Sequence, residues 1–101
     1  MEQEIVIKGG FSLNYKRERY PLVNLIVTKE ELIVKTKAYG IYKFLPENIL
    51  EIEPVFFFPF LGQGIQITGK NDQYGDSIYF WSFRNPWKLI RQIREIGFLS
   101  S

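Results

Sequence analysis

The sequence predicts a single, mainly β domain that ends in one amphipathic α-helix. Aromatic residues make up 17% of the chain, and aromatic side chains favour the half-buried surface of a pleated sheet. Short apolar runs, several of them alternating with polar residues, follow one another as far as Phe83 and are separated by Gly, Pro and charged turns. A chain of 101 residues needs only one hydrophobic core, so we expect one domain over residues 1–101.

The first half of the chain contains the patterns of several short strands. Near the N-terminus, Gly9 and Gly10 separate two apolar runs, Ile5 to Ile7 and Phe11 to Tyr15. Glycine inside a strand pattern marks a bulge or a break, so these runs form either one kinked strand or two short ones. Further strands are expected at residues 22–28, 32–37 and 41–45.

The second half of the chain predicts three more strands before the helix. In the first of them, Leu50 and Ile52 are expected to point into the core. Glu51 and Glu53 alternate with them and should therefore face solvent. The three strands are expected at residues 49–53, 65–68 and 77–83.

The C-terminal segment has the start, the apolar face and the end of an α-helix over about residues 86–97. Asn85 can accept hydrogen bonds from the first free N–H groups of the helix, and Pro86 suits the first helical position. Gly97 suits the left-handed conformation that commonly ends a helix. Trp87 is expected to begin the buried face, which continues through Leu89, Ile90, Ile93 and Ile96.

Three segments of the chain carry hydrophobic patterns of one family of small β domains. Residues 25–34, Leu-Ile-Val-Thr-Lys-Glu-Glu-Leu-Ile-Val, have the pattern of a hairpin with a Thr-x-x-x-Leu turn. Residues 44–53 have the pattern of a strand followed by Ile-x-x-Ile, and residues 78–87 that of a last strand entering a helix. Together they resemble bacterial pleckstrin-homology-like and GRAM-type domains over most of Val23 to Phe98.

This resemblance implies a bent, antiparallel, two-sheet barrel of about seven strands, capped by the C-terminal helix. The family includes phosphoinositide readers, peptide-binding modules and bacterial domains that assemble into rings. It therefore supports an expectation about the fold more than about one function.

The composition excludes much of the usual chemistry of enzymes. The chain has no His and no Cys, which removes the commonest acid–base group at neutral pH, the commonest transition-metal ligand and the thiolate nucleophile. Glu51 and Glu53 are close enough in sequence to act as a carboxylate pair, but we interpret them as a solvated strand face. We therefore expect no enzyme, no catalytic or metal site, no cofactor and no small-molecule substrate.

The net charge and the hydropathy of the chain limit where the protein is expected to be located and which partners it is expected to bind. The formal net charge is +2, which is too small to indicate a nucleic-acid partner. No long apolar run and no signal-peptide pattern is present, so we expect a cytoplasmic protein. The cations of the terminal helix, which we interpret as its solvated face, are Arg84, Lys88, Arg91 and Arg94.

The apolar segment from Phe56 to Leu61 is the first candidate interaction surface. Pro54 and Pro59 predict an edge strand or a loop here. So many adjacent apolar side chains cannot all face one small core, which leaves an interface or a segment covered on both sides between two sheets. An interface would hold a partner protein, a second copy of the chain or a membrane surface. Its candidate residues are Phe56, Phe57, Phe58, Phe60 and Leu61.

A basic cluster near the N-terminus is the second candidate surface. It consists of Lys8, Lys16, Arg17 and Arg19. The resemblance implies that Lys8 and Arg17-Glu18-Arg19 imitate the residues that bind lipid headgroups, whereas a solvated hairpin explains the same cations equally well. The sequence therefore predicts a non-enzymatic binding or self-assembly module, with a peripheral module for anionic lipids as the alternative.

Overall fold

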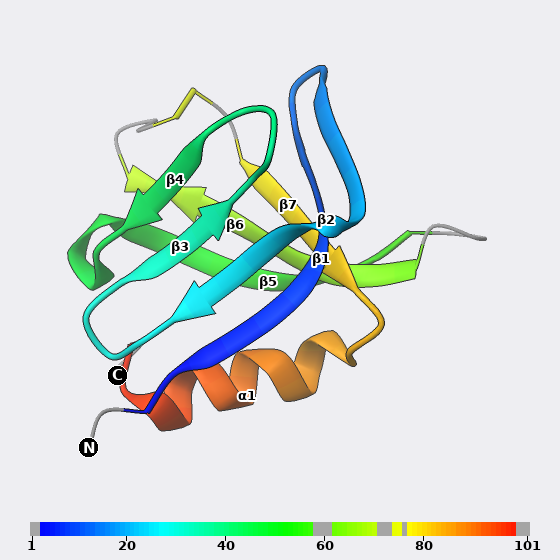
Figure 1. Ribbon diagram of the computed structural model, residues 1–101. Helices are drawn as coiled ribbons and strands as arrows, with labels where there is room; N and C mark the ends of the chain where they lie inside the picture. Colours follow the sequence, from blue (N-terminus) through cyan, green and yellow to red (C-terminus); the bar gives the residue numbers. More distant parts are fainter. Residues whose placement is uncertain (1–2, 58–61, 71–73, 76, 99–101) are drawn as a thin grey trace.

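The protein is described by a computed structural model that covers residues 3–57, 62–70, 74–75 and 77–98. Seven antiparallel strands form one continuous sheet in the order β4-β3-β2-β1-β7-β6-β5, and the sheet curls into a half-barrel with one C-terminal helix packed against it (Figure 1). The prediction of a mainly β fold with one terminal helix is confirmed. The elements are β1 (Ile5–Leu13), β2 (Lys16–Val27), β3 (Leu32–Lys35), β4 (Ile41–Phe44), the 3₁₀ turn η1 (Pro46–Asn48), β5 (Ile49–Phe57), β6 (Gly62–Gly69), β7 (Ile78–Ser82) and α1 (Pro86–Ile96).

β1 is a single kinked strand that joins the two halves of the sheet. Its pairing with β2 shifts register between Gly9 and Phe11, and its second half also pairs with β7. A side chain at Gly9 would come within 2.7 Å of the Phe80 ring, and one at Gly10 within 2.8 Å of the Trp81 indole. The two glycines therefore let the strand bend while aromatic side chains of β7 pack directly on its backbone.

β2 is longer than the sequence indicates, because the charged residues before Tyr20 belong to the strand. Glu18 lies opposite Phe11 of β1 and is buried. Its carboxylate accepts hydrogen bonds from the backbone N–H groups of Lys37 and Ala38, in the turn between β3 and β4. Such donors compensate the buried carboxylate for its lost hydration. The two hydrogen bonds also hold this turn against β2.

The core lies inside the curl of the sheet. The expectation for the start of β5 is half right: Ile52 is buried, but Leu50 is 63% exposed. The pairing of β5 with β6 shifts register between Ile49 and Glu51, and this shift places Ile49 inside in place of Leu50. The largest fully buried side chains come from both halves of the sheet and from the C-terminal segment; they include Phe11, Phe44, Phe80, Phe98, Leu25, Leu32, Ile65, Ile67, Ile78, Leu89 and Ile93.

Helix α1 begins and ends where the sequence predicts. The side chain of Asn85 accepts hydrogen bonds from the backbone N–H of Trp87 at 2.9 Å and of Lys88 at 3.2 Å. Gly97 follows the helix with φ of 101°, in the left-handed region. In the described part of the chain, no helix is long and apolar enough to cross a bilayer.

The expectation that Trp87 packs in the core is wrong, because its side chain is 61% exposed. Trp87 has the helical spacing of Arg91 and Arg94, both exposed, and not that of the buried apolar face. The buried side chains of α1 are Pro86, Leu89, Ile90, Ile93 and Ile96.

Both outer strands of the sheet carry a feature that limits pairing with another chain. On β4, the hydroxyl of Tyr74 accepts from the backbone N–H of Lys43 and donates to its carbonyl, both at 2.9 Å. The Tyr74 ring also packs edge-on against Tyr42 and Phe44. On β5, Pro54 lacks an N–H group and cannot donate to an added strand.

Candidate functional site

Four exposed aromatic side chains lie at the end of the molecule where α1 begins. Their exposed fractions are 44% for Tyr20, 59% for Phe56, 80% for Phe83 and 61% for Trp87. The ring centroids of Tyr20 and Phe83 are 4.9 Å apart in an edge-on contact. We call these four residues the aromatic end.

Sheet pairing explains why residues distant in sequence lie on the same side of the molecule. Phe56 of β5 lies opposite Gln63 of β6, and Gln63 lies opposite Ser82 of β7. Phe83 directly follows Ser82, and Trp87 lies in the first turn of α1. The end of β5, the end of β7 and the start of α1 lie on the same side of the molecule, at the right of Figure 1.

The aromatic end overlaps only in part with the segment that the sequence singles out. Phe56 is exposed as an interface requires, whereas Phe58, Phe60 and Leu61 lie outside the described residues. The Phe57 side chain also lies outside the described part of the structure. Sequence reasoning missed Tyr20, Phe83 and Trp87. For Trp87 a signal was available, because its helical spacing from Arg91 and Arg94 places it on the exposed face of the helix.

Cations border the aromatic end. Arg19 directly precedes Tyr20, Arg84 directly follows Phe83, and Lys88 follows Trp87; all three are exposed. The Arg84 guanidinium also donates a long hydrogen bond of 3.4 Å to the side chain of Gln92. Three of the four aromatic residues therefore have an exposed cation as a direct sequence neighbour.

The predicted basic cluster is spread along the first two strands. Lys16, Arg17 and Arg19 lie in the first half of β2, where Arg17 is opposite Ser12 of β1. Lys8 lies four positions before Ser12, which is about 13 Å along an extended strand. Arg17 and Arg19 share one strand face and are exposed, so the structure places these two together and Lys8 further along the sheet.

Glu51 and Glu53 are exposed on the solvent face of β5, as the sequence predicts. A hydrogen bond to Glu53 and the repulsion between the two carboxylates raise the pKa of Glu51 above its usual value. Residues 3–57, 62–70, 74–75 and 77–98 contain no group of three or more acidic side chains that could hold a metal ion. We interpret the pair as a solvated strand face.

Replacing Glu51 with Gln is expected to raise the thermal midpoint at pH 7 and to leave it unchanged at pH 3. Because the pKa of Glu51 is higher in the folded state than in the unfolded state, the folded protein binds this proton more tightly. Repulsion between the Glu51 and Glu53 carboxylates therefore lowers the free energy of unfolding as the pH rises above the usual range of a Glu pKa. Circular dichroism melts from pH 3 to 7 measure this effect, with Glu47→Gln as the matched control. A pH-independent difference between Glu51→Gln and the wild type would contradict it.

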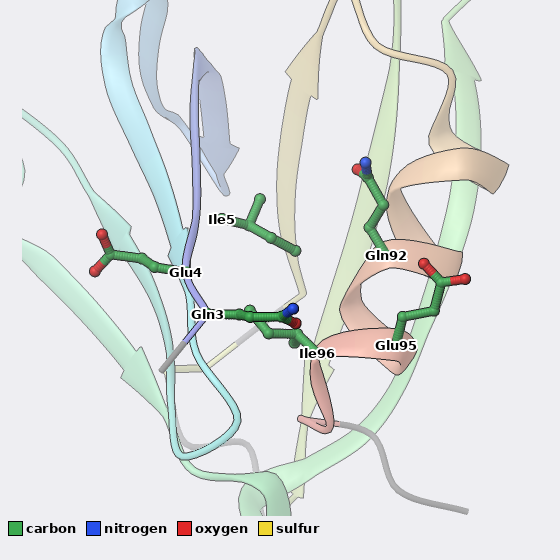
Figure 2. Close-up of a pocket in the computed structure, with 6 residues that line it drawn as sticks. All are labelled: Gln3, Glu4, Ile5, Gln92, Glu95 and Ile96. Carbon is green, nitrogen blue, oxygen red and sulfur yellow. The ribbon is translucent and has the colours of Figure 1, made fainter. Parts of the chain in front are cut away.

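A hollow of about 420 Å³ lies between the start of β1 and the last turns of α1 (Figure 2). Gln3, just before β1, and Ile5, its first residue, turn toward the helix, whereas the carboxylate of Glu4 turns to the other side of the chain. From α1, Gln92, Glu95 and Ile96 complete the lining. The six lining residues are two amides, two carboxylates and two apolar side chains, and the Glu4 carboxylate turns away from the helix, so the two carboxylates do not converge in the hollow.

Comparison of the chain with family models, with curated proteins and with solved structures found no match. The aromatic end and the hollow are therefore defined by the residues and the geometry of this chain.

Proposed function

We propose that the protein is a non-enzymatic binding module of the pleckstrin-homology-like type and that the aromatic end is its contact surface. The exposure of four large aromatic side chains at one end of the sheet carries this proposal. Tyr20 and Phe83 are in ring contact, and exposed apolar patches on protein surfaces commonly mark interaction sites. The order of seven antiparallel strands followed by one helix supports the resemblance to this type of domain. The lack of His and Cys supports a role in binding over catalysis.

The partner that we propose for this surface is a second copy of the chain. In a dimer with two-fold symmetry, both protomers bury the same residues in the interface. Each exposed ring therefore contributes binding energy from both protomers. Burying an aromatic or large aliphatic side chain contributes about 1.5–3 kcal/mol, and association has its own entropic cost, so such a dimer should form in a concentration-dependent way. The bordering cations are expected to stay at the solvated rim of the contact.

Phe83→Ser and Trp87→Ser are each expected to weaken self-association by about tenfold or more, because buried aromatic residues at the centre of an interface carry most of its energy. Light scattering coupled to size-exclusion chromatography, over a series of loading concentrations, measures the change. Tyr15→Ser is the matched control, since Tyr15 is 89% exposed in the turn between β1 and β2. A wild-type protein that stays monomeric at millimolar concentration would rule out self-association.

A second candidate function is peripheral binding of anionic lipid, favoured by the exposure of Arg17 and Arg19 on one face of β2. Paired cations bind anionic headgroups and lose affinity as salt screens their charge. Co-sedimentation with phosphatidylserine-containing vesicles is expected to fall when Arg17 and Arg19 are both replaced by Ala. Arg94→Ala, at the far end of α1, is the control. Equal binding to neutral vesicles would contradict this function.

A further inference from the structure

The outer face of β7 carries two partly exposed aromatic side chains, Tyr79 and Trp81. The residues that alternate with them, Ile78, Phe80 and Ser82, are buried inside the curl of the sheet. β7 lies between β1 and β6, so neither ring is on an edge strand (Figure 1). Residues two apart on one strand face are separated by about 6.7 Å, which makes Tyr79 and Trp81 neighbours along the strand.

The surface beside Trp81 is shallow. Trp81 is directly opposite Gly10 of β1 and Gly64 of β6, and neither glycine has a side chain to rise beside the ring. The indole lies over Gly10, where a side chain would collide with it. A shallow surface with a partly exposed ring suits a ligand that is itself planar, because two flat rings can stack.

The charge differs between the two sides of this face. The row of directly paired residues that crosses the sheet here consists of Glu53, Gln66, Tyr79, Ser12 and Arg17. Arg17 on β2 and Glu53 on β5 are each two strands from Tyr79, about 10 Å. Arg19 shares the strand face of Arg17, and both are exposed. An anionic group is therefore attracted on the β2 side of β7 and repelled on the β5 side.

From these observations, we infer that the outer face of β7, together with Arg17 and Arg19, binds a single-stranded polynucleotide. Successive bases stack on Tyr79 and Trp81, and the sugar–phosphate backbone lies on the β2 side, where the two arginines bind phosphates. The spacing of about 6.7 Å is about twice the 3.4 Å between bases stacked in a duplex strand, so it suits an extended strand with unstacked bases.

This site goes beyond the proposed contact surface, because it uses none of the four residues of the aromatic end. The net charge of +2 does not by itself predict a polynucleotide, but the separation of charge across β7 favours one. Arg17 and Arg19 also belong to the second candidate function, so the test has to separate a polynucleotide from an anionic lipid.

The test is the fluorescence anisotropy of two fluorescein-labelled decamers, one of uridine and one of deoxyuridine, titrated with the full chain. We expect the anisotropy to rise with protein concentration. Tyr79→Val is expected to weaken binding by about tenfold, because it removes one stacking ring. Tyr79→Phe keeps the ring and should retain the affinity of the wild type. Equal losses in these two variants would overturn the stacking role.

The salt dependence of the affinity tests the two arginines. Arg17→Ala together with Arg19→Ala is expected to weaken binding by about tenfold at low salt. The slope of log affinity against log salt should fall by about 1.4, because each phosphate contact to a single strand contributes about 0.7. The matched control is Arg91→Ala together with Arg94→Ala, which removes the same charge from α1 and should leave affinity and slope unchanged. Equal effects of the two double variants would contradict a site on β7.

Two further outcomes would overturn the inference. One is no change in the anisotropy of either decamer at millimolar protein. The other is binding to phosphatidylserine-containing vesicles without binding to the decamers, which would assign Arg17 and Arg19 to lipid alone. Tighter binding of one decamer would identify the partner as RNA or DNA, because the two differ only in the 2′-hydroxyl. Trp87→Ser should bind both decamers as the wild type does, so this test and that of the aromatic end can fail independently.

Discussion

Replacing Glu18 with Ala is expected to lower the free energy of unfolding by about 2–4 kcal/mol. The carboxylate accepts hydrogen bonds from the N–H groups of Lys37 and Ala38, and its removal leaves both donors without this partner in a partly buried turn. Hydrogen bonds to charged groups contribute about 1.5–3 kcal/mol each, and the recovered desolvation cost of the carboxylate offsets part of the loss. Urea denaturation followed by tryptophan fluorescence measures the change.

Two variants separate this fastening role from a general loss of charge. Glu18→Gln keeps one acceptor oxygen and should lose about half as much stability. Glu47→Ala removes an exposed carboxylate in η1 and should stay within about 0.5 kcal/mol of the wild type. A Glu18→Ala variant as stable as Glu47→Ala would show that the turn between β3 and β4 does not depend on Glu18.

Replacing Gly64 with Ala is expected to cost about 2–3 kcal/mol of stability or more. A Cβ at this position would lie 2.6 Å from the Cα of Trp81 and closer still to the carbonyl oxygen of Phe80. Both atoms belong to the backbone of β7, which pairs with β6 at this residue, so neither can move without distorting the sheet. Urea denaturation again provides the measurement.

Gly40→Ala is the matched control for Gly64→Ala. A Cβ at Gly40 would meet nothing within 4 Å, and its φ of 88° leaves only a conformational cost of about 1–2 kcal/mol. If Gly64→Ala cost less than Gly40→Ala, the close approach of β6 and β7 would be contradicted.

Local signals in the sequence predict the helix and several strand positions. Asn85, Pro86 and Gly97 are sufficient to place α1, because capping and helix termination depend on neighbouring residues. The kink of β1 likewise follows from Gly9 and Gly10, although only the pairing with β2 and β7 shows that it is one strand.

Features that depend on tertiary pairing could not be predicted in this way. The strand role of the charged run in β2 depends on Glu18 meeting the turn between β3 and β4, which lies about twenty residues away. The exposure of Leu50 depends on a register shift against β6. The aromatic end depends on β5 and β7 lying on either side of β6, so no single segment of sequence contains it.

The most direct test of the proposed contact surface is a dilution series of the labelled protein, from millimolar to micromolar, followed by nuclear magnetic resonance. The indole signal of Trp87 and the amide signals of Tyr20, Phe56 and Phe83 are expected to move with concentration. The indole of Trp81 packs over Gly10 and serves as the internal control that stays constant. Spectra that are identical at all concentrations, or shifts confined to β3 and β4, would contradict the assignment of the aromatic end as the surface of self-association.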